Sequence, residues 1–291
     1  MSIWIALILG IVQGLCEFLP ISSSGHLVLL QQVFGIDNGA LFFTIMLHLG
    51  TLIAVFVIYR RQIWEIVKSM CRFIALLFTL RFNELGKHLK TPTQRKIIML
   101  MLATLATTVL ALIFKDVIDE SYEGKYLGFG FIATALILFA MNFIHAKKQT
   151  IAKMRVPAAL GIGLIQGVAI LPGISRSGST IAGATFFGLR KDEAAEFSFL
   201  LSIPAILGSL VFEIPNVIKT GLSNIPWIPV LVGVIAAAVS GFLAIKLMIR
   251  LIVNKSLNVF AIYTAVLGIA VLLDQLVFNV VLSNPFTTPI A

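Results

Sequence analysis

The chain has 291 residues, of which 59% are hydrophobic and only 12% are charged, and its mean hydropathy is +1.02. This composition excludes a soluble globular domain and indicates a polytopic membrane protein. The net charge of +9 comes from Lys and Arg gathered in a few segments. Such gathering is typical of cytoplasmic loops, so we expect a membrane and no nucleic acid as partner.

Six apolar segments come close to, or exceed, the roughly 20 residues that cross a hydrocarbon core. Their apolar runs are continuous, which predicts helices and excludes a transmembrane barrel. The N-terminal stretch has no basic region and no cleavage pattern, so we expect it to stay in the fold. Cys16 and Cys71 lie in different contexts and are expected to be free thiols. The six predicted spans are residues 41–59, 97–114, 127–144, 197–214, 227–249 and 259–280.

Positive charge sets the expected orientation of these spans. Residues 1–59 contain no Lys or Arg, whereas residues 60–96 contain nine and residues 147–155 contain four. Because cytoplasmic loops are enriched in Lys and Arg, we place the two basic segments in the cytoplasm. The acidic loop at 116–123 and the C-terminus then fall on the outer side.

One segment begins and ends on the same side of the membrane. Residues 157–189 start and finish in the cytoplasm and are too short for two spans and a turn, so they predict a re-entrant hairpin. Residues 1–40 end outside, and if the uncharged N-terminus is also outside, they form a second hairpin that enters from the opposite face.

The two hairpins resemble each other. GIVQG at 10–14 and ISSSG at 21–25 match GLIQG at 163–167 and ISRSG at 174–178, at a constant offset of 153. A repeat with opposite orientation in its two copies predicts an inverted-topology architecture, in which polar sites form near the membrane midplane.

The predicted fold class is therefore an all-α polytopic membrane protein with an inverted-topology repeat, about six full transmembrane helices and two re-entrant helical hairpins. We expect one integral membrane domain over residues 1–291. Repeat 1 covers 1–144, with the hairpin 1–40 and the cytoplasmic basic loop 60–96, and repeat 2 covers 154–280, with the hairpin 157–189.

The first hairpin contains QGLCEFLPISSSGH at 13–26. Gln13 and Glu17 are four residues apart and share one face of a helix. A carboxylate at membrane depth must pair, bind a cation or stay protonated. Glu17 is a candidate base or metal ligand, Ser23 is a candidate nucleophile, and His26 is a candidate acid or base.

The second hairpin contains LPGISRSGST at 171–180. Arg176 is the natural countercharge for Glu17, and its planar fork suits phosphate oxygens. A turn rich in Ser and Gly that opens a half-helix forms an anion nest, although the pattern lacks the Gly-Lys-Ser/Thr ending of a nucleotide P-loop. The candidate phosphate-binding residues are Ser22, Ser24, Gly25, Gly173, Ser175, Ser177, Gly178 and Thr180.

Each of these residues also has a purely structural interpretation. Small residues in membrane helices serve close packing, and Glu17 and Arg176 can form a structural salt bridge. His48 has no such neighbours in sequence and is interpreted as structural, although Gly50 and Thr51 leave a cavity-lining role open. His88 and His145 lie in basic loops and are expected to be solvated.

The motifs at 13–26 and 171–180, with FSFLLSIPAILG at 197–208, resemble the undecaprenyl-diphosphate phosphatase family associated with bacitracin resistance. The resemblance covers essentially the whole chain. It implies an enzyme of the bacterial inner (cytoplasmic) membrane that removes the terminal phosphate of a polyprenyl diphosphate and recycles the lipid carrier of cell-wall synthesis. The site is expected to open on the outer, periplasmic face.

The family's carboxylate motif takes Glu or Gln first and Glu second, so it falls on Gln13 and Glu17. Gln13 removes one charge and weakens a two-carboxylate metal site. The resemblance also implies a divalent cation, magnesium or calcium, for which Glu17 and Gln13 are the candidate ligands. The other functional residues of the family map to the catalytic hydroxyl of Ser23, to His26, and to the phosphate-binding Arg176 with Ser175 and Ser177 beside it.

The resulting hypothesis is metal-assisted phosphoryl transfer in which Arg176 and the nest hold the diphosphate. Glu17 activates Ser23 or a water, and His26 is either the acid/base partner or the attacking group. The rival function is a secondary transporter or flippase for an anionic substrate, because paired re-entrant hairpins also occur in transporters. A homodimer is left open.

Overall fold

The computed structural model describes residues 2–36, 40–144, 148–220, 226–254, 256–278 and 280–282. Within these ranges the regular structure is helical, and the one β-type pairing is an isolated bridge between Gln149 and Leu189. The all-α prediction is therefore confirmed.

Long apolar helices account for the predicted spans. In the described part of the chain four helices are long and apolar enough to cross a membrane, and a fifth passes the same test when it is joined to the helix that follows it across an 87° bend. The protein is therefore a multi-pass membrane protein. The four are α6 (Pro92–Ile113), α11 (Lys191–Thr220), α12 (Trp227–Asn254) and α13 (Asn258–Leu273), which continues into the π-helical turn η4 (Asp274–Phe278), and the bent pair is α3 (Ala40–Ile58) with α4 (Arg60–Phe78).

The remaining predicted span, 127–144, corresponds to α8 (Leu127–Ala140), an apolar helix of 14 residues. The short helix η1 (Met141–Phe143) extends it, and α7 (Lys115–Ser121) lies in the predicted acidic loop. All six predicted spans thus fall on helices.

Four shorter helices lie in the two segments for which re-entrant hairpins are predicted: α1 (Ile3–Phe18), α2 (Ser23–Val33), α9 (Val156–Val168) and α10 (Arg176–Phe186). With 11 to 16 residues each, they are about 16–24 Å long, which is short of a ~30 Å hydrocarbon core. Pro20 follows α1 and Pro172 follows α9, and proline cannot continue a helix interior. The helix α10 begins and ends 153 positions after α2, which is the offset of the sequence match.

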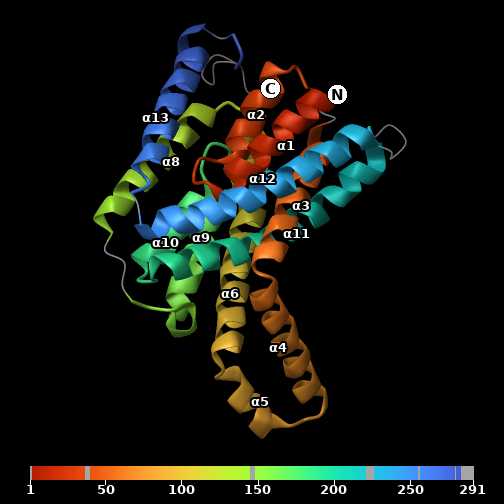
Figure 1. Ribbon diagram of the computed structural model, residues 1–291, viewed down its shortest axis with the longest axis vertical. Helices are drawn as coiled ribbons and strands as arrows, with labels where there is room; N and C mark the ends of the chain where they lie inside the picture. Colours follow the sequence, from red (N-terminus) through yellow and green to blue (C-terminus); the bar gives the residue numbers. More distant parts are fainter. Residues whose placement is uncertain are drawn as a thin grey trace.

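The helices pack in pairs (Figure 1). α1 lies against α12, α9 against α6 and α8 against α13, while α3 contacts both α11 and α12. The main core gathers around the C-terminal end of α1, where the buried rings of Phe18 and Phe199 meet edge-on at 5.6 Å. This packing holds the polar end of α1 in the centre of the molecule.

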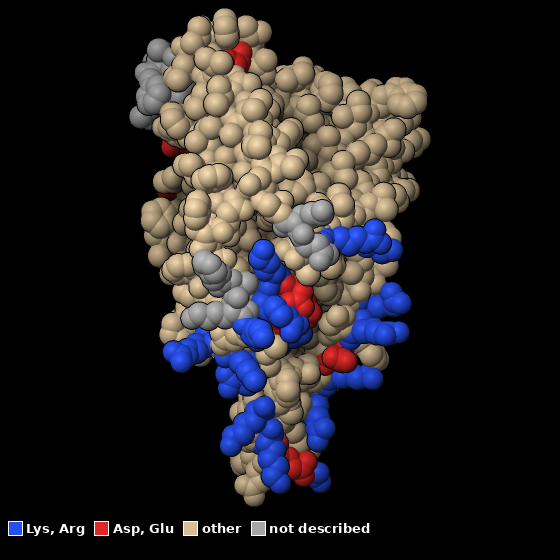
Figure 2. Space-filling view, turned by 60° about the vertical axis from the view of Figure 1, so that its left-hand side comes forward, with Lys and Arg blue, Asp and Glu red and all other residues tan. Residues whose placement is uncertain are grey.

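The basic segment 60–96 is helical. The helices α4 and α5 (Phe82–Leu89) form a hairpin that leads into α6 and projects from the bundle (Figure 1). Lys and Arg side chains gather toward this end on the face shown in Figure 2. The expectation that His88 is solvated is wrong: the side chain is buried, and its Nε2 lies 3.0 Å from the Ser69 carbonyl oxygen. It is buried because α5 folds back against α4. His145 lies outside the described residues.

Cys16 is buried and Cys71 is exposed, and both are free, as predicted. A short 3-10 helix, η2 (Ile151–Lys153), precedes α9.

The contact between α1 and α12 depends on Gly14. A Cβ atom added there would collide with Ser240 Oγ and with the carbonyl oxygen of Ala237. We expect Gly14→Ala to destabilise the protein by about 1–3 kcal/mol, because α1 must shift away from α12. Thermal unfolding in detergent checks this, with Gly86→Ala in α5 as the control, since a Cβ there meets nothing within 4 Å. Equal melting temperatures for the two variants would contradict the prediction.

Candidate active site

The candidate site is built around the carboxylate of Glu17, whose side chain is 2% exposed. Its Oε2 accepts hydrogen bonds from Gln13 Nε2 at 2.9 Å and from Ser23 Oγ at 2.6 Å. Its Oε1 accepts a hydrogen bond from Arg176, the first residue of α10. On α3, His48 Nε2 lies 3.7 Å from Oε2. Four helices therefore place a polar group against one buried carboxylate.

Three of these partners of Glu17 are more open than Glu17 itself, whereas Gln13 is fully buried. The Arg176 side chain is 17% exposed and the His48 side chain 23% exposed, and Ser23 is partly exposed. An incoming anion thus meets the guanidinium and the hydroxyl first, while the carboxylate stays behind them. The predicted pair of Glu17 and Arg176 is formed between the two hairpins.

The turns of the two hairpins touch at two further points. Ser177 Oγ donates to the carbonyl oxygen of Leu19 at 3.2 Å. A Cβ on Gly25 would lie 2.8 Å from the backbone nitrogen of Gly173, so a side chain at position 25 has no room. Gly173 has φ +87°, a conformation that glycine adopts without strain. The small residues of both motifs therefore serve the close approach of the two turns.

Ser22 and Ser175 begin the second helix of each hairpin. Ser22 Oγ accepts from Gly25 N at 3.3 Å and Ser175 Oγ from Gly178 N at 3.1 Å. Ser22 does so at φ +70°, which is uncommon for a residue other than glycine and costs energy. This strained turn orients the next residue, Ser23, toward Glu17.

Two other predicted phosphate ligands have partners within the protein. Ser24 Oγ lies 3.4 Å from Ser22 Oγ. Thr180 Oγ1 donates to the carbonyl oxygen of Arg176 at 2.8 Å and lies 2.6 Å from Ser198 Oγ on α11. Thr180 therefore links α10 to α11.

His26 is held away from Glu17. Its Nδ1 lies 2.7 Å from the carbonyl oxygen of Ser22 and its Nε2 lies 2.7 Å from Tyr263 Oη. A carbonyl can only accept, so Nδ1 carries a proton, and in the neutral ring Nε2 accepts from the tyrosine. The two rings also stack, with 5.7 Å between their centroids. Among the described residues no hydrogen bond joins His26 to Glu17 or Ser23, so the structure does not form the predicted cluster of all three.

Three residues of the site were not predicted from the sequence. His48 Nδ1 donates to the Thr44 carbonyl oxygen at 2.8 Å, which turns its Nε2 toward Glu17. On α8, Thr134 Oγ1 donates to the Gly173 carbonyl oxygen at 2.7 Å and accepts from Ser175 N at 2.8 Å, so it fixes the second turn. Tyr263 is the third. The Gly50-Thr51 pair was a weak signal for His48, whereas Thr134 and Tyr263 had no local signal.

The donors available to a cation are oxygens. Gln13 Oε1 is buried and has no hydrogen-bond partner, while Nε2 of the same amide group donates a hydrogen bond to Glu17. Within the described ranges no three His, Cys, Asp or Glu side chains meet as a ligand set. One carboxylate and one amide oxygen fit a hard cation such as Mg²⁺ only when substrate phosphates complete its shell.

Comparisons with known proteins identify the family of this chain. Residues 6–270 match the family described as bacitracin resistance protein BacA. An undecaprenyl-diphosphatase of Alkaliphilus metalliredigens is 41% identical over 280 residues, which is 95% of this chain and 100% of that protein. A second, of Carboxydothermus hydrogenoformans, is 40% identical over 93% of this chain and 96% of the relative. A third, of Methanosphaera stadtmanae, is 37% identical over 94% of this chain and 98% of the relative.

Proposed function

The chain belongs to the bacitracin resistance protein BacA family, and on that premise we propose how the residues around Glu17 perform its reaction. The protein dephosphorylates undecaprenyl diphosphate to undecaprenyl phosphate and inorganic phosphate. The observation that carries the mechanism is that the Glu17 carboxylate accepts hydrogen bonds from both the Ser23 hydroxyl and the Arg176 guanidinium. A nucleophile, its base and a phosphate clamp thereby share one site.

The diphosphate binds between the two hairpin turns. Arg176 offers its remaining N–H donors to the phosphate oxygens while one N–H stays on Glu17. The first turns of α2 and α10 add backbone N–H groups that have no partner within their helix. Two helix N-termini and one guanidinium favour the negative charge of the diphosphate, and they stabilise the charge that spreads over the transferred group in the transition state.

Ser23 attacks the terminal phosphorus. Glu17 takes the hydroxyl proton across the 2.6 Å hydrogen bond, the new bond joins Ser23 Oγ to phosphorus, and the bond to the bridging oxygen breaks. The proton passes from Glu17 to the departing undecaprenyl phosphate. In the second half Glu17 takes a proton from water, the hydroxide releases phosphate, and Ser23 recovers its proton.

His26 has a positioning role in this mechanism. Both nitrogens of the ring are engaged, one by the Ser22 carbonyl oxygen and one by Tyr263 Oη. The bond to Ser22 also holds the strained residue beside the nucleophile. We therefore assign His26 to positioning of the turn, and we do not assign it to attack on phosphorus.

A divalent cation, magnesium or calcium, would be held by Glu17 and Gln13 together with the diphosphate. It would neutralise phosphate charge when bound. The unpaired Gln13 Oε1 supports this proposal.

We propose that repeat 1 (1–144) and repeat 2 (154–280) are related by inverted topology around this site. The proposal is supported by the matching bounds of α2 and α10, and by the packing of α1 on α12 where α9 packs on α6. The basic segments mark the cytoplasmic side. The hairpin of α1 and α2 then enters from the outer side of the cytoplasmic membrane, and the site opens on that side. Dephosphorylation there returns the lipid carrier to cell-wall synthesis.

The first test is phosphate release by the purified protein from farnesyl diphosphate and from undecaprenyl diphosphate. We expect release with Mg²⁺ or Ca²⁺ and a loss of at least tenfold with chelator, restored by adding the cation back. Transport of the lipid across sealed vesicles without phosphate release would instead support the flippase. Release that is unchanged by chelator would refute the cation proposal and leave the phosphatase intact.

His48 gives a second prediction. Its Nε2 faces Glu17 Oε2 at 3.7 Å, so we assign it to positioning of the carboxylate. We expect His48→Phe, which fills the space without a polar atom, to lower kcat about tenfold to a hundredfold because Glu17 is less well fixed. His48→Gln restores a donor and should recover most of kcat. Equal losses in the two variants, with unchanged folding, would show that His48 acts only through packing.

A further inference from the structure

Helix α4 has an exposed apolar stripe that the phosphatase reaction does not use. From Trp64 to Leu77 its members recur at intervals of three or four residues, Phe78 follows Leu77 directly, and all are 42–82% exposed. Three or four residues make one turn of an α-helix, so these side chains lie on one face. The stripe consists of Trp64, Val67, Met70, Ile74, Leu77 and Phe78.

The neighbouring face of α4 is basic. Arg61, Lys68 and Arg72 follow each other along it, and Lys68 Nζ lies 5.3 Å from the centre of the Trp64 ring. Residues 60–96 contain nine Lys and Arg but only two acidic residues, Glu65 and Glu84. An apolar stripe beside a basic face, with Trp at the boundary, is typical of a helix that lies in a membrane interface.

The direction of α4 fits such a position. The helices α3 and α4 pass the length and hydropathy test for a membrane span only as a pair, and the chain bends by 87° between them. Because of this bend α4 does not continue α3 across the bilayer. The bend at Tyr59 and Arg60 therefore places the first turns of α4, with Arg61, at the level where α3 ends.

The turn after α4 is apolar as well. Phe78, Leu80 and Phe82 are 63–82% exposed. Leu80 has φ +54°, where a turn ordinarily takes Gly or Asn. A leucine kept in a strained, exposed turn between two exposed phenylalanines points to an apolar environment outside the protein.

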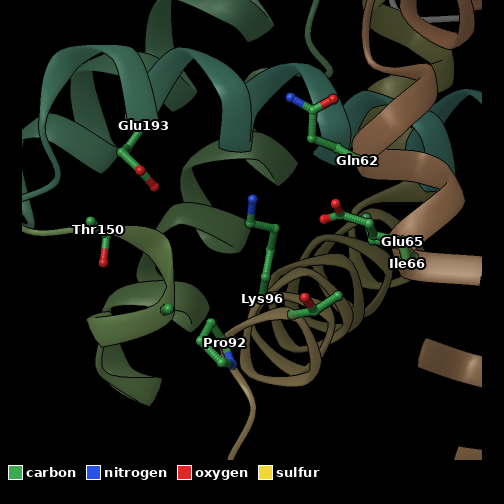
Figure 3. Close-up of a pocket in the computed structure, with 9 residues that line it drawn as sticks. Gln62, Glu65, Ile66, Pro92, Lys96, Thr150 and Glu193 are labelled. Carbon is green, nitrogen blue, oxygen red and sulfur yellow. The ribbon is translucent and has the colours of Figure 1, made fainter. Parts of the chain in front are cut away.

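Another side of α4 borders a polar hollow. A hollow of about 340 Å³ lies between α4, α6, η2 and the start of α11. Figure 3 shows Lys96 in the middle of this hollow, with Glu193 on one side and Gln62 and Glu65 on the other. These polar side chains distinguish this side of α4 from its apolar stripe.

We propose that α4 is an interfacial helix that inserts its stripe into the cytoplasmic leaflet and binds anionic phospholipid headgroups through Arg61, Lys68 and Arg72. Apolar burial gives the helix its depth, and the basic face gives the preference for anionic lipid, which salt screens. This surface is separate from the site at Glu17.

The native Cys71 allows a direct test. It is exposed on α4, seven residues from both Trp64 and Phe78 and thus on the same face, whereas Cys16 is buried. We would attach a spin label to Cys71 in the full-length protein in nanodiscs of phosphatidylcholine, with and without phosphatidylglycerol. A label attached at Glu65→Cys in a Cys71→Ser background is the matched control on the face that lines the hollow.

We expect the ratio of oxygen to nickel-chelate accessibility to be several-fold higher at Cys71 than at position 65, and to rise further with phosphatidylglycerol at low salt. Lys68→Gln with Arg72→Gln should abolish that further rise. Equal ratios at the two positions would show that the stripe faces water and would overturn the proposal. Low accessibility to both reagents, with spin–spin broadening, would overturn it in favour of a second copy of the chain.

Discussion

Replacing Arg176 with alanine is expected to lower phosphate release from undecaprenyl diphosphate by about a thousandfold or more. Among the described residues the guanidinium is the one Lys or Arg group bonded to Glu17, and Arg176 starts the helix whose N-terminus is proposed to face the diphosphate. Loss of a single preorganised donor to a developing anion already costs roughly 10²–10³ in kcat, and arginines that clamp transferred phosphoryl groups contribute about 10³–10⁵. Colorimetric detection of phosphate from purified protein measures the effect.

The alanine variant also leaves the Glu17 carboxylate buried without its main partner, which can destabilise the fold by roughly 3–5 kcal/mol. Two variants separate this loss from catalysis. The double variant Arg176→Ala with Glu17→Gln removes both charges and should recover stability without recovering activity. Arg176→Lys keeps the charge but loses the planar fork, so it should retain a small part of the activity. Turnover near the wild-type rate in folded Arg176→Ala would refute the proposed clamp.

The parts of the fold that the sequence predicts are those set by local pattern. The six predicted spans follow from continuous apolar runs, and each falls on a helix. The 153-residue offset between the two motifs is also the offset between the bounds of α2 and α10. The contact between Gln13 and Glu17 follows from helical spacing alone.

The parts that sequence reasoning missed depend on contacts between distant segments. Tyr263 is 237 residues away from His26, and their hydrogen bond is made only after α13 packs beside α8. His48 looks like any polar residue on an apolar helix until α3 brings it to Glu17. His88 was assigned to water because its neighbours in sequence are basic, yet the fold buries it against Ser69. In each case tertiary packing decides the environment of the residue.

Ser23→Ala is the second variant for which we expect a very large loss, on the order of 10³-fold or more in kcat. Its hydroxyl donates to Glu17 at 2.6 Å and is the only hydroxyl bonded to that carboxylate among the described residues. Ser24→Ala is the matched control, because Ser24 has the same side chain one residue away and bonds to Ser22 instead. We expect Ser24→Ala to lose no more than about tenfold, as is typical of a neutral hydrogen bond.

The same reaction must pass through a phosphoserine, which distinguishes attack by Ser23 from attack by a water that Glu17 activates. Acid quench of the working enzyme followed by mass spectrometry should find phosphate on the peptide that contains Ser23, and Ser23→Ala should abolish it. If a water attacked instead, Ser23→Ala would keep a substantial fraction of kcat and no phosphopeptide would form. The distance from Ser23 Oγ to Glu17 Oε2 favours the first outcome, because a hydroxyl already bonded to the base transfers its proton without rearrangement.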